Sequence, residues 1–179
     1  TVHESLTIQH VPSPSLGANE AKIHVAAAAW NKRDHWIKMG KYPGIQTPAI
    51  LGSDGCGVVT ECPDAPVWVG KEVVMCPSIN WGESPAYQAM NYTILGMPTQ
   101  GTAAAEICVP ISNLAEKPSH LSSVEAAAIP LAGLTAWRAV STKAHVTSGE
   151  MVLVTGKKIN VSALHFCTSG APEPEGVMR

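Results

Sequence analysis

The chain has 179 residues, which suits one domain of ordinary size or one domain with part of a second. Hydrophobic residues make up 45% and charged residues 15%, a composition that allows a core and disfavours general disorder. The net charge is −2 with no basic block, and no apolar run approaches the roughly 20 residues that cross a bilayer, so we expect neither a nucleic-acid nor a membrane partner. Thr1–Pro14 shows no secretory leader, and the five cysteines form no C-x-x-C pair, so we expect a cytoplasmic location.

The first part of the sequence predicts short strands joined by turns. Alternating apolar residues over Ala21–Ala28 indicate a half-buried strand. A short helix is expected next, with Asn31 as its N-cap, Asp34 three positions later and Gly40 at its end. Further strands are expected at Ala49–Thr60, Lys71–Cys76 and Ala103–Pro110. Between the last two, Pro77–Thr99 reads as a long irregular loop, a kind of segment that is often functional.

The pattern changes near residue 121, where helical signals begin. Ser122 and Glu125 form a capping box at a helix start, and Pro130 is expected to break or kink that helix. A helical stripe then runs to about Lys143. Met151–Thr155 is a short apolar run, typical of a strand buried in a parallel sheet.

Five segments follow one another in the sequence: AAAAWNKRDHWIKMGKYPG (Ala26–Gly44), PAILGSDGCGVV (Pro48–Val59), GKEVVMCP (Gly70–Pro77), VEAAAIPLAGLTAWRAV (Val124–Val140) and SGEMVLVTG (Ser148–Gly156). In this order and spacing they resemble the medium-chain dehydrogenase/reductases of the alcohol dehydrogenase-like superfamily, in their zinc-free, quinone-oxidoreductase-like branch. The resemblance implies a mainly β fold with some α: a GroES-like, partly open β-barrel over residues 1–120 and an incomplete Rossmann-type α/β segment over 121–170. Residues 171–179 are rich in Pro, Gly and Glu, which predicts a disordered tail.

The resemblance also bears on metal binding. Zinc-dependent members place ligands at positions that Asn31 and Ser53 occupy here, and amide and hydroxyl groups are poor zinc ligands beside thiolate and imidazole. The seven histidines show no i, i+4 pair, so we expect no zinc and no other metal site. Asp54 could bind a metal, or it could fix the turn around Gly52–Gly57 through backbone hydrogen bonds.

A zinc-free relative polarises its carbonyl or enone substrate by hydrogen bonds, while a nicotinamide cofactor supplies the hydride. The resemblance implies NADPH as that cofactor and points to Asn31 as an amide in the nicotinamide pocket, to Tyr42 as a donor to the substrate oxygen, and to Thr135 beside the nicotinamide. Each has an alternative: Asn31 as a helix cap only, Tyr42 as a packing residue, and Thr135 bonded to the preceding helical turn. Gly156 would begin the turn that approaches the diphosphate.

After Gly156 the sequence departs from the family, because Lys157–Asn160 replaces the expected glycines and only 23 residues follow. By family we expect an NAD(P)H-dependent reductase of quinones, enones or aldehydes, with this chain inactive or weakly active. The alternative is a non-enzymatic GroES-like module that binds itself or another protein. Its interface would be the apolar faces of Val124–Val140 and Met151–Thr155.

Overall fold

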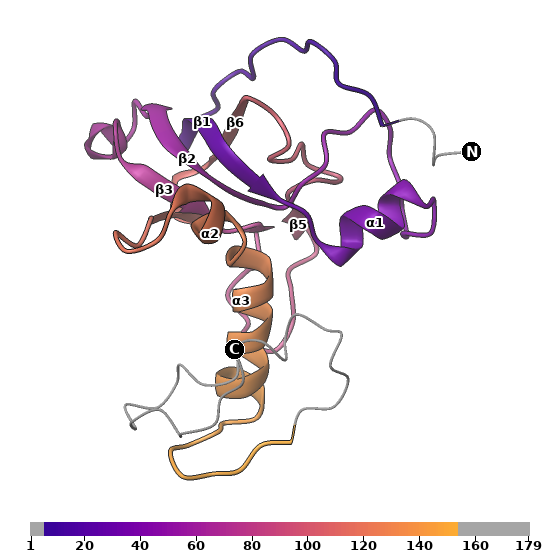
Figure 1. Ribbon diagram of the computed structural model, residues 1–179, viewed down its shortest axis with the longest axis vertical. Helices are drawn as coiled ribbons and strands as arrows, with labels where there is room; N and C mark the ends of the chain where they lie inside the picture. Colours follow the sequence, from indigo (N-terminus) through magenta and orange to yellow (C-terminus); the bar gives the residue numbers. More distant parts are fainter. Residues whose placement is uncertain (1–5, 154–179) are drawn as a thin grey trace. The chain divides into compact units, whose positions relative to one another are not determined.

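A computed structural model describes residues 6–153 of the chain (Figure 1). The chain divides between Leu131 and Ala132 into two compact units. The predicted tail at residues 171–179, Gly156 and the last part of the expected α/β segment, residues 154–170, lie outside the described residues. No helix within residues 6–153 is long and apolar enough to cross a membrane.

The first unit is built on a five-stranded antiparallel sheet with the strand order β6-β1-β2-β3-β7, of which Figure 1 labels β6, β1, β2 and β3. A separate ribbon pairs two short strands, β4 and β5. The four strands predicted within this unit are confirmed, although those expected from Ala49 and Ala103 begin later, and β4, β5 and β7 were not predicted. The strands are β1 (Glu20–Ala29), β2 (Asp54–Glu61), β3 (Glu72–Met75), β4 (Ser78–Ile79), β5 (Thr93–Ile94), β6 (Glu106–Pro110) and β7 (Leu114–Glu116).

The main core lies on one face of this sheet, where alternate strand residues are buried. Ala21 and Ile23 of β1 are fully buried and pack in one cluster with Val59, Val73 and other apolar side chains of the neighbouring strands. A close approach between β1 and β2 requires a glycine at position 57, because a Cβ atom there would lie 2.2 Å from the carbonyl oxygen of His24.

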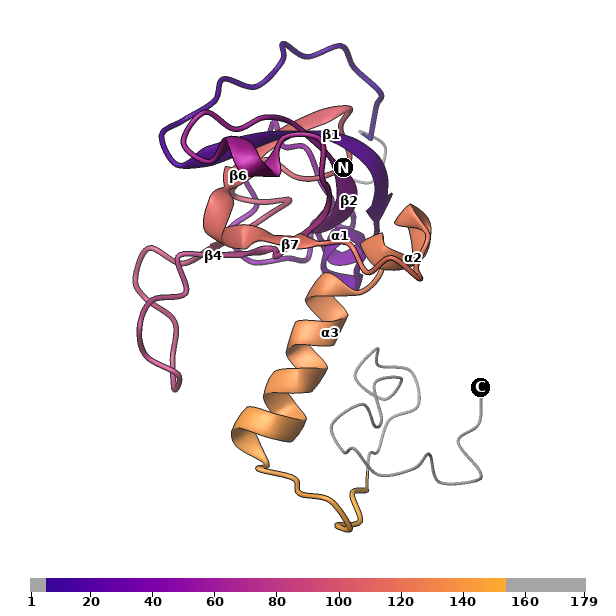
Figure 2. The ribbon, with the colours of Figure 1, turned by 90° about the vertical axis from the view of Figure 1, so that its left-hand side faces the viewer.

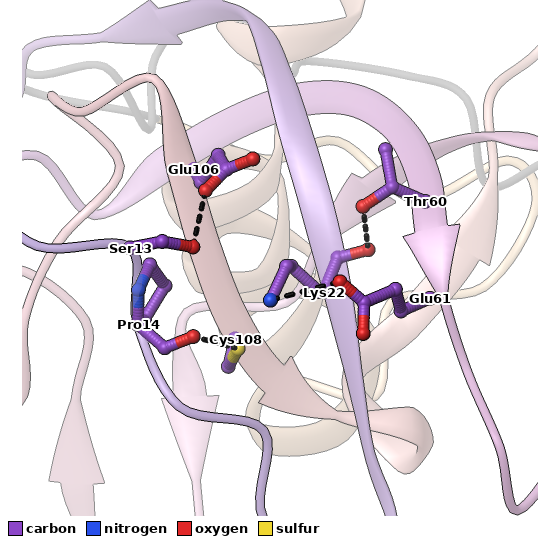
Figure 3. Close-up of polar contacts among 7 residues, drawn as sticks. All are labelled: Ser13, Pro14, Lys22, Thr60, Glu61, Glu106 and Cys108. Carbon is purple, nitrogen blue, oxygen red and sulfur yellow. Dashed lines mark hydrogen bonds and ion pairs between the residues drawn. The ribbon is translucent and has the colours of Figure 1, made fainter.

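The N-terminal segment is tied to the sheet by polar contacts (Figure 3). The hydroxyl of Ser13 donates to Glu106 over 2.5 Å, and the thiol of Cys108 donates to the carbonyl of Pro14 over 3.8 Å. On the next strand pair, Lys22 forms a 2.9 Å ion pair with Glu61. These contacts fasten a segment without regular structure, whose residue Leu6 reaches the candidate site described below.

Two helices of the first unit begin where their caps predict. The helix α1 (Lys32–Lys38) has Asn31 as its N-cap, and Gly40 follows it with a positive φ of 68°. The helix α2 (Ser123–Ala127) begins with the predicted capping box of Ser122 and Glu125. Single turns of 3-10 helix occur at η2 (Pro66–Trp68) and η3 (Ile111–Asn113). Helix α2 packs its two buried alanines, Ala126 and Ala127, against Cys56.

The segment expected to be an irregular loop, Pro77–Thr99, contains the β4–β5 ribbon. The loop between these two strands extends away from the five-stranded sheet (Figure 2). Within it, the indole of Trp81 donates to the carbonyl of Ser84 and packs edge-on against the ring of Tyr92, with 5.4 Å between ring centroids. Aromatic packing of this kind gives the loop a local core.

The helix α3 (Pro130–Trp137) begins at the predicted breaking point and carries the chain into the second unit, where it continues as the π-helical segment η4 (Arg138–Lys143). The predicted helical stripe up to Lys143 is thus confirmed. The predicted strand at Met151–Thr155 is wrong for residues 151–153, which have no regular structure and leave Met151 and Leu153 exposed. A parallel strand needs a neighbouring strand to accept its hydrogen bonds, and none of the described residues supplies one.

Candidate functional site

A cavity of about 260 Å³ opens beside the start of α1. Four of its residues come from one face of that helix, at the i, i+3, i+4 and i+7 spacing that places side chains on one side of a helical cylinder. Apolar residues from the N-terminal segment and from the loop before β2 complete it. The lining residues are Leu6, Trp30, Asn31, Asp34, His35, Lys38 and Leu51.

Asp34 joins α1 to the opposite wall of this cavity. Its Oδ2 accepts the backbone N–H of Asn31 over 2.8 Å, which satisfies one of the unpaired donors at the helix start. Its Oδ1 accepts the backbone N–H of Gly52 over 3.1 Å. Because Asp34 is almost fully buried and uses both oxygens, it sets the spacing between the two walls of the cavity.

Asn31 is held from a second direction by Asp54, the first residue of β2. The Nδ2 of Asn31 donates to Oδ2 of Asp54 over 2.7 Å, and Oδ1 of Asp54 accepts the backbone N–H of Leu131 over 2.8 Å. Burial raises the pKa of Asp54 to about 6, partly opposed by the hydrogen bonds from Asn31 and Leu131, with the negative charge of Asp34 adding to the rise. The expectation that Asp54 fixes the Gly52–Gly57 turn is therefore wrong for its side chain, because both carboxylate oxygens accept hydrogen bonds from residues 23 and 77 positions away.

Arg33 points to the other side of α1 and is buried without an ion pair among the described residues. Its Nη1 donates to Oγ of Ser53 and to the carbonyl of Leu95, each over 2.9 Å, and its Nη2 donates to the carbonyl of Met97 over 2.8 Å. The guanidinium lies 5.1 Å from the ring centroid of Tyr42, a cation–π distance. Its Nε is the one buried side-chain nitrogen or oxygen in residues 6–153 that lacks a hydrogen-bond partner.

Of the four residues singled out from the sequence, Asn31 lies at the cavity. Tyr42 is half-buried, packs near Ile37 and under Arg33, and is not among the cavity-lining residues. Thr135 is exposed on α3, which lies in the second unit from Ala132 onward, and Gly156 lies outside the described residues. The sequence reasoning did not assign Asp34, His35 and Lys38 to a site, although their helical spacing from Asn31 is the signal that groups them.

The two positions where zinc-dependent relatives carry ligands are already engaged in hydrogen bonds. The amide of Asn31 donates to Asp54, while the hydroxyl of Ser53 donates to the carbonyl of Leu95 over 2.7 Å and accepts from Arg33. A buried guanidinium next to Ser53 would also repel a divalent cation. No group of three or more His, Cys, Asp or Glu residues suited to a metal ion occurs within residues 6–153. This donor set does not fit zinc.

Comparison with known proteins supports the likeness that the motifs indicate. The model of the alcohol dehydrogenase GroES-like domain matches residues 17–119, more than half of the chain. A zinc-type alcohol dehydrogenase-like protein, YogA, of Leptosphaeria maculans is 36% identical over 167 residues, covering 87% of this chain and 47% of that protein. The 2-methylene-furan-3-one reductase of Solanum lycopersicum is 32% identical over 158 residues, covering 87% of this chain and 38% of that protein.

Solved structures show the same relationship. The crystal structure of an NAD-dependent alcohol dehydrogenase superposes with a TM-score of 0.71 at 37% sequence identity, covering 79% of this chain and 44% of that one. The chain thus spans about half the length, or less, of the proteins it matches. With the matching domain model, the antiparallel sheet and these relatives together, the chain belongs to the alcohol dehydrogenase GroES-like domain family of the medium-chain dehydrogenase/reductases.

Proposed function

We propose that this chain supplies the GroES-like domain of an NAD(P)H-dependent oxidoreductase that reduces a carbonyl or enone compound, such as a quinone, an enone or an aldehyde, without zinc. The observation that carries the proposal is the cavity beside α1, where one buried amide, that of Asn31, lies among apolar walls. Sites for small organic molecules are mostly apolar and contain a few fixed polar groups. The kinship with a furanone reductase and with an alcohol dehydrogenase supports the reaction class.

The cofactor proposed is NADPH, which would supply the hydride. The described residues fit the nicotinamide end of such a cofactor, because the exposed indole of Trp30 and the side chain of Leu51 offer apolar surface and Asn31 offers an amide at the same cavity. Residues of this chain bind and orient the reactants and exclude water from the reacting centre. The turn at Gly156, proposed to contact the diphosphate, and Thr135, proposed to lie beside the nicotinamide, belong to the same proposal.

Polarisation of the substrate oxygen is assigned to hydrogen bonds instead of a metal. An amide N–H held in a cavity sheltered from water stabilises a developing oxyanion more strongly than the same group does in water. Asn31 is the candidate for this role at the cavity. Tyr42 remains a proposed second donor, and its ring position beside Arg33 would have to change for its hydroxyl to reach the cavity.

The test is NADPH consumption by the purified chain with 2-cyclohexen-1-one, a simple quinone and an aldehyde in parallel. The expected result is weak turnover with one of them, because the chain spans less than half the length of its relatives, and a loss of about 100-fold in kcat/KM for Asn31→Ala, the scale seen on removal of one oxyanion donor. Lys32→Ala, an exposed substitution on the same helix, is the matched control and should leave turnover unchanged. Absence of both NADPH binding and turnover at saturating cofactor would overturn the proposal for this chain.

A second candidate function is protein binding, and it rests on exposed apolar side chains. In the first unit, Val124 of α2 is 72% exposed and Ile129 is 45% exposed. In the second unit, Leu134 and Trp137 of α3 and the pair Met151 and Leu153 are exposed. Surfaces of this kind mark interfaces when they are contiguous. Concentration-dependent self-association in light scattering that Val124→Ser and Trp137→Ser abolish would favour this candidate, and a monomer at high concentration would count against it.

A further inference from the structure

We infer that Asp54 is the positioning residue of Asn31: its carboxylate holds the side-chain amide in one orientation and leaves one amide hydrogen to donate to a carbonyl oxygen of a ligand in the cavity. The inference rests on the proposed function for the ligand class, a small carbonyl compound. It adds a residue that is not among those lining the cavity and that the sequence suggested only as a metal ligand or a turn residue.

The orientation of the amide follows from the chemistry of its partner. An ionised carboxylate only accepts hydrogen bonds, so the nitrogen of the Asn31 amide, and not its oxygen, must face Asp54. The reversed amide would place two acceptor oxygens against each other at 2.7 Å. The Nδ2 atom carries two hydrogens, and the described residues accept one of them. The second is therefore left for a ligand at the cavity that Asn31 lines.

Asp54 can hold the Asn31 amide in this orientation because its own side chain and backbone are held by burial and hydrogen bonds. Its side chain is 1% exposed, and its other carboxylate oxygen accepts the N–H of Leu131 in the first turn of α3. Its own backbone carbonyl accepts the hydroxyl of Thr102 over 2.7 Å. Because both oxygens of the Asp54 carboxylate accept hydrogen bonds and its main chain lies in β2, the carboxylate cannot rotate. It therefore fixes the orientation of the Asn31 amide relative to β2.

The substitution Asp54→Asn isolates this role, because it keeps the shape of the side chain and replaces two acceptors by one acceptor and one NH2 group. The new amide still accepts the N–H of Leu131 with its oxygen, but it then presents NH2 to Asn31. The Asn31 amide must turn its oxygen toward position 54 or lose the bond. Its donor hydrogens then no longer occupy the orientation that the carboxylate imposes.

The test uses the NH2 signals of Asn31 in nitrogen-15 NMR of the full chain, assigned by their disappearance in Asn31→Asp. In the wild type, one of the two amide hydrogens of Asn31 donates to a carboxylate and the other does not, so their chemical shifts should differ widely. Both chemical shifts should change with pH as Asp54 ionises, since the pKa of Asp54 lies at about 6. The other ionisable groups near this site are Asp34, His35 and Lys38 at the cavity and the thiol of Cys76 after β3, so Asp34→Asn and His35→Gln serve to separate the contributions of Asp34 and His35.

The expected result is that Asp54→Asn brings the two proton shifts together and removes their pH dependence, while Asp54→Glu restores part of both. Glu125→Gln, which changes an exposed carboxylate in the capping box of α2, is the control and should leave the Asn31 pair unmoved. An Asn31 pair that is the same in wild type and Asp54→Asn overturns the inference, provided the backbone signals show both proteins folded.

Titration with 2-cyclohexen-1-one, without cofactor, separates this inference from the proposed function. The expected result is a shift of the Asn31 pair in the wild type and a dissociation constant raised about 5-fold in Asp54→Asn, the factor that corresponds to one hydrogen bond. The two proton signals of Asn31 could respond to Asp54→Asn while neither this enone nor benzoquinone shifts them. That outcome would support positioning by Asp54 and would rule out the proposed ligand class. Equal affinity of both proteins for the enone overturns the claim that the orientation serves a ligand.

Discussion

The guanidinium of Arg33 donates to the hydroxyl of Ser53 over 2.9 Å, beneath α1 and away from the cavity. The two residues lie within the two segments, Ala26–Gly44 and Pro48–Val59, whose counterparts in zinc-dependent relatives carry metal ligands. Here a buried cation and a hydroxyl join the same segments instead, and the carbonyls of Leu95 and Met97 complete the arrangement. The start of α1 and the loop before β2 are thus held together by hydrogen bonds.

Arg33→Met should destabilise the chain by about 2–3 kcal/mol, because it leaves the carbonyl of Met97 without the donor it has here and removes one donor from Ser53 and one from Leu95. The gain from no longer burying an unpaired cation offsets only part of this loss. Denaturant unfolding measures the difference, with Lys32→Met on the exposed face of the same helix as the control. Equal unfolding midpoints for wild type and Arg33→Met would show that these bonds contribute nothing net.

The stability that Asp54 contributes should depend on pH in the direction opposite to most carboxylates. Its pKa is raised from 3.8 to about 6 in the folded chain, so the folded state holds the proton more tightly than the unfolded state does. The contribution is therefore fully present below about pH 4 and is lost as the pH rises through 6. The loss amounts to about 3 kcal/mol, since one unit of pKa corresponds to about 1.4 kcal/mol.

Unfolding of wild type and Asp54→Asn at intervals between pH 4 and 7 measures this difference. The stability of the wild type relative to the variant should fall across that range. Glu125 should show the opposite pH dependence of stability, because hydrogen bonds from Ser122 lower its pKa. Its contribution to stability is therefore lost on acidification. A flat difference between wild type and Asp54→Asn would contradict the burial of an ionisable Asp54.

Gly57→Ala should destabilise the chain strongly, by about 3 kcal/mol, because the added Cβ would meet the backbone carbonyl of His24 at 2.2 Å and force β1 and β2 apart. Gly44→Ala is the matched comparison, since its added Cβ would meet nothing within 4 Å and only its φ of 64° opposes the substitution, at a cost of about 1 kcal/mol. Thermal unfolding of the two variants side by side should rank them in this order, and the reverse order would show that the strand contact relaxes.

Ser122→Ala should cost about 1 kcal/mol, because it removes the side-chain acceptor for the N–H of Glu125 at the start of α2. The effect extends beyond the helix end, as α2 buries Ala126 and Ala127 against Cys56 of β2. Amide hydrogen exchange in α2 should accelerate in this variant. Ser112→Ala, in the turn η3 before β7, is a control that leaves α2 exchange unchanged.

Local signals predicted the secondary structure well where a short stretch of sequence suffices to specify it. The alternation in β1, the Asn31 and Gly40 boundaries of α1 and the capping box of α2 each depend on residues within one or two turns of each other. The strand predicted at Met151 failed for the opposite reason: a strand exists only beside a partner, and apolar composition does not reveal whether a partner is present.

The sequence by itself determined the family and the order of most elements, and it singled out Asn31 as a candidate, because motifs and helix caps are formed by residues that are close together in the sequence. Only the tertiary structure decided what Asn31 touches. Asp54 lies 23 residues away from it, and Leu131 lies a further 77 residues along the chain. Hydrogen bonds over such separations arise from strand pairing and helix packing, which bring distant segments together and leave no periodic trace in the sequence. The same holds for Tyr42, whose ring packs against Arg33 because the loop after α1 folds back over the helix.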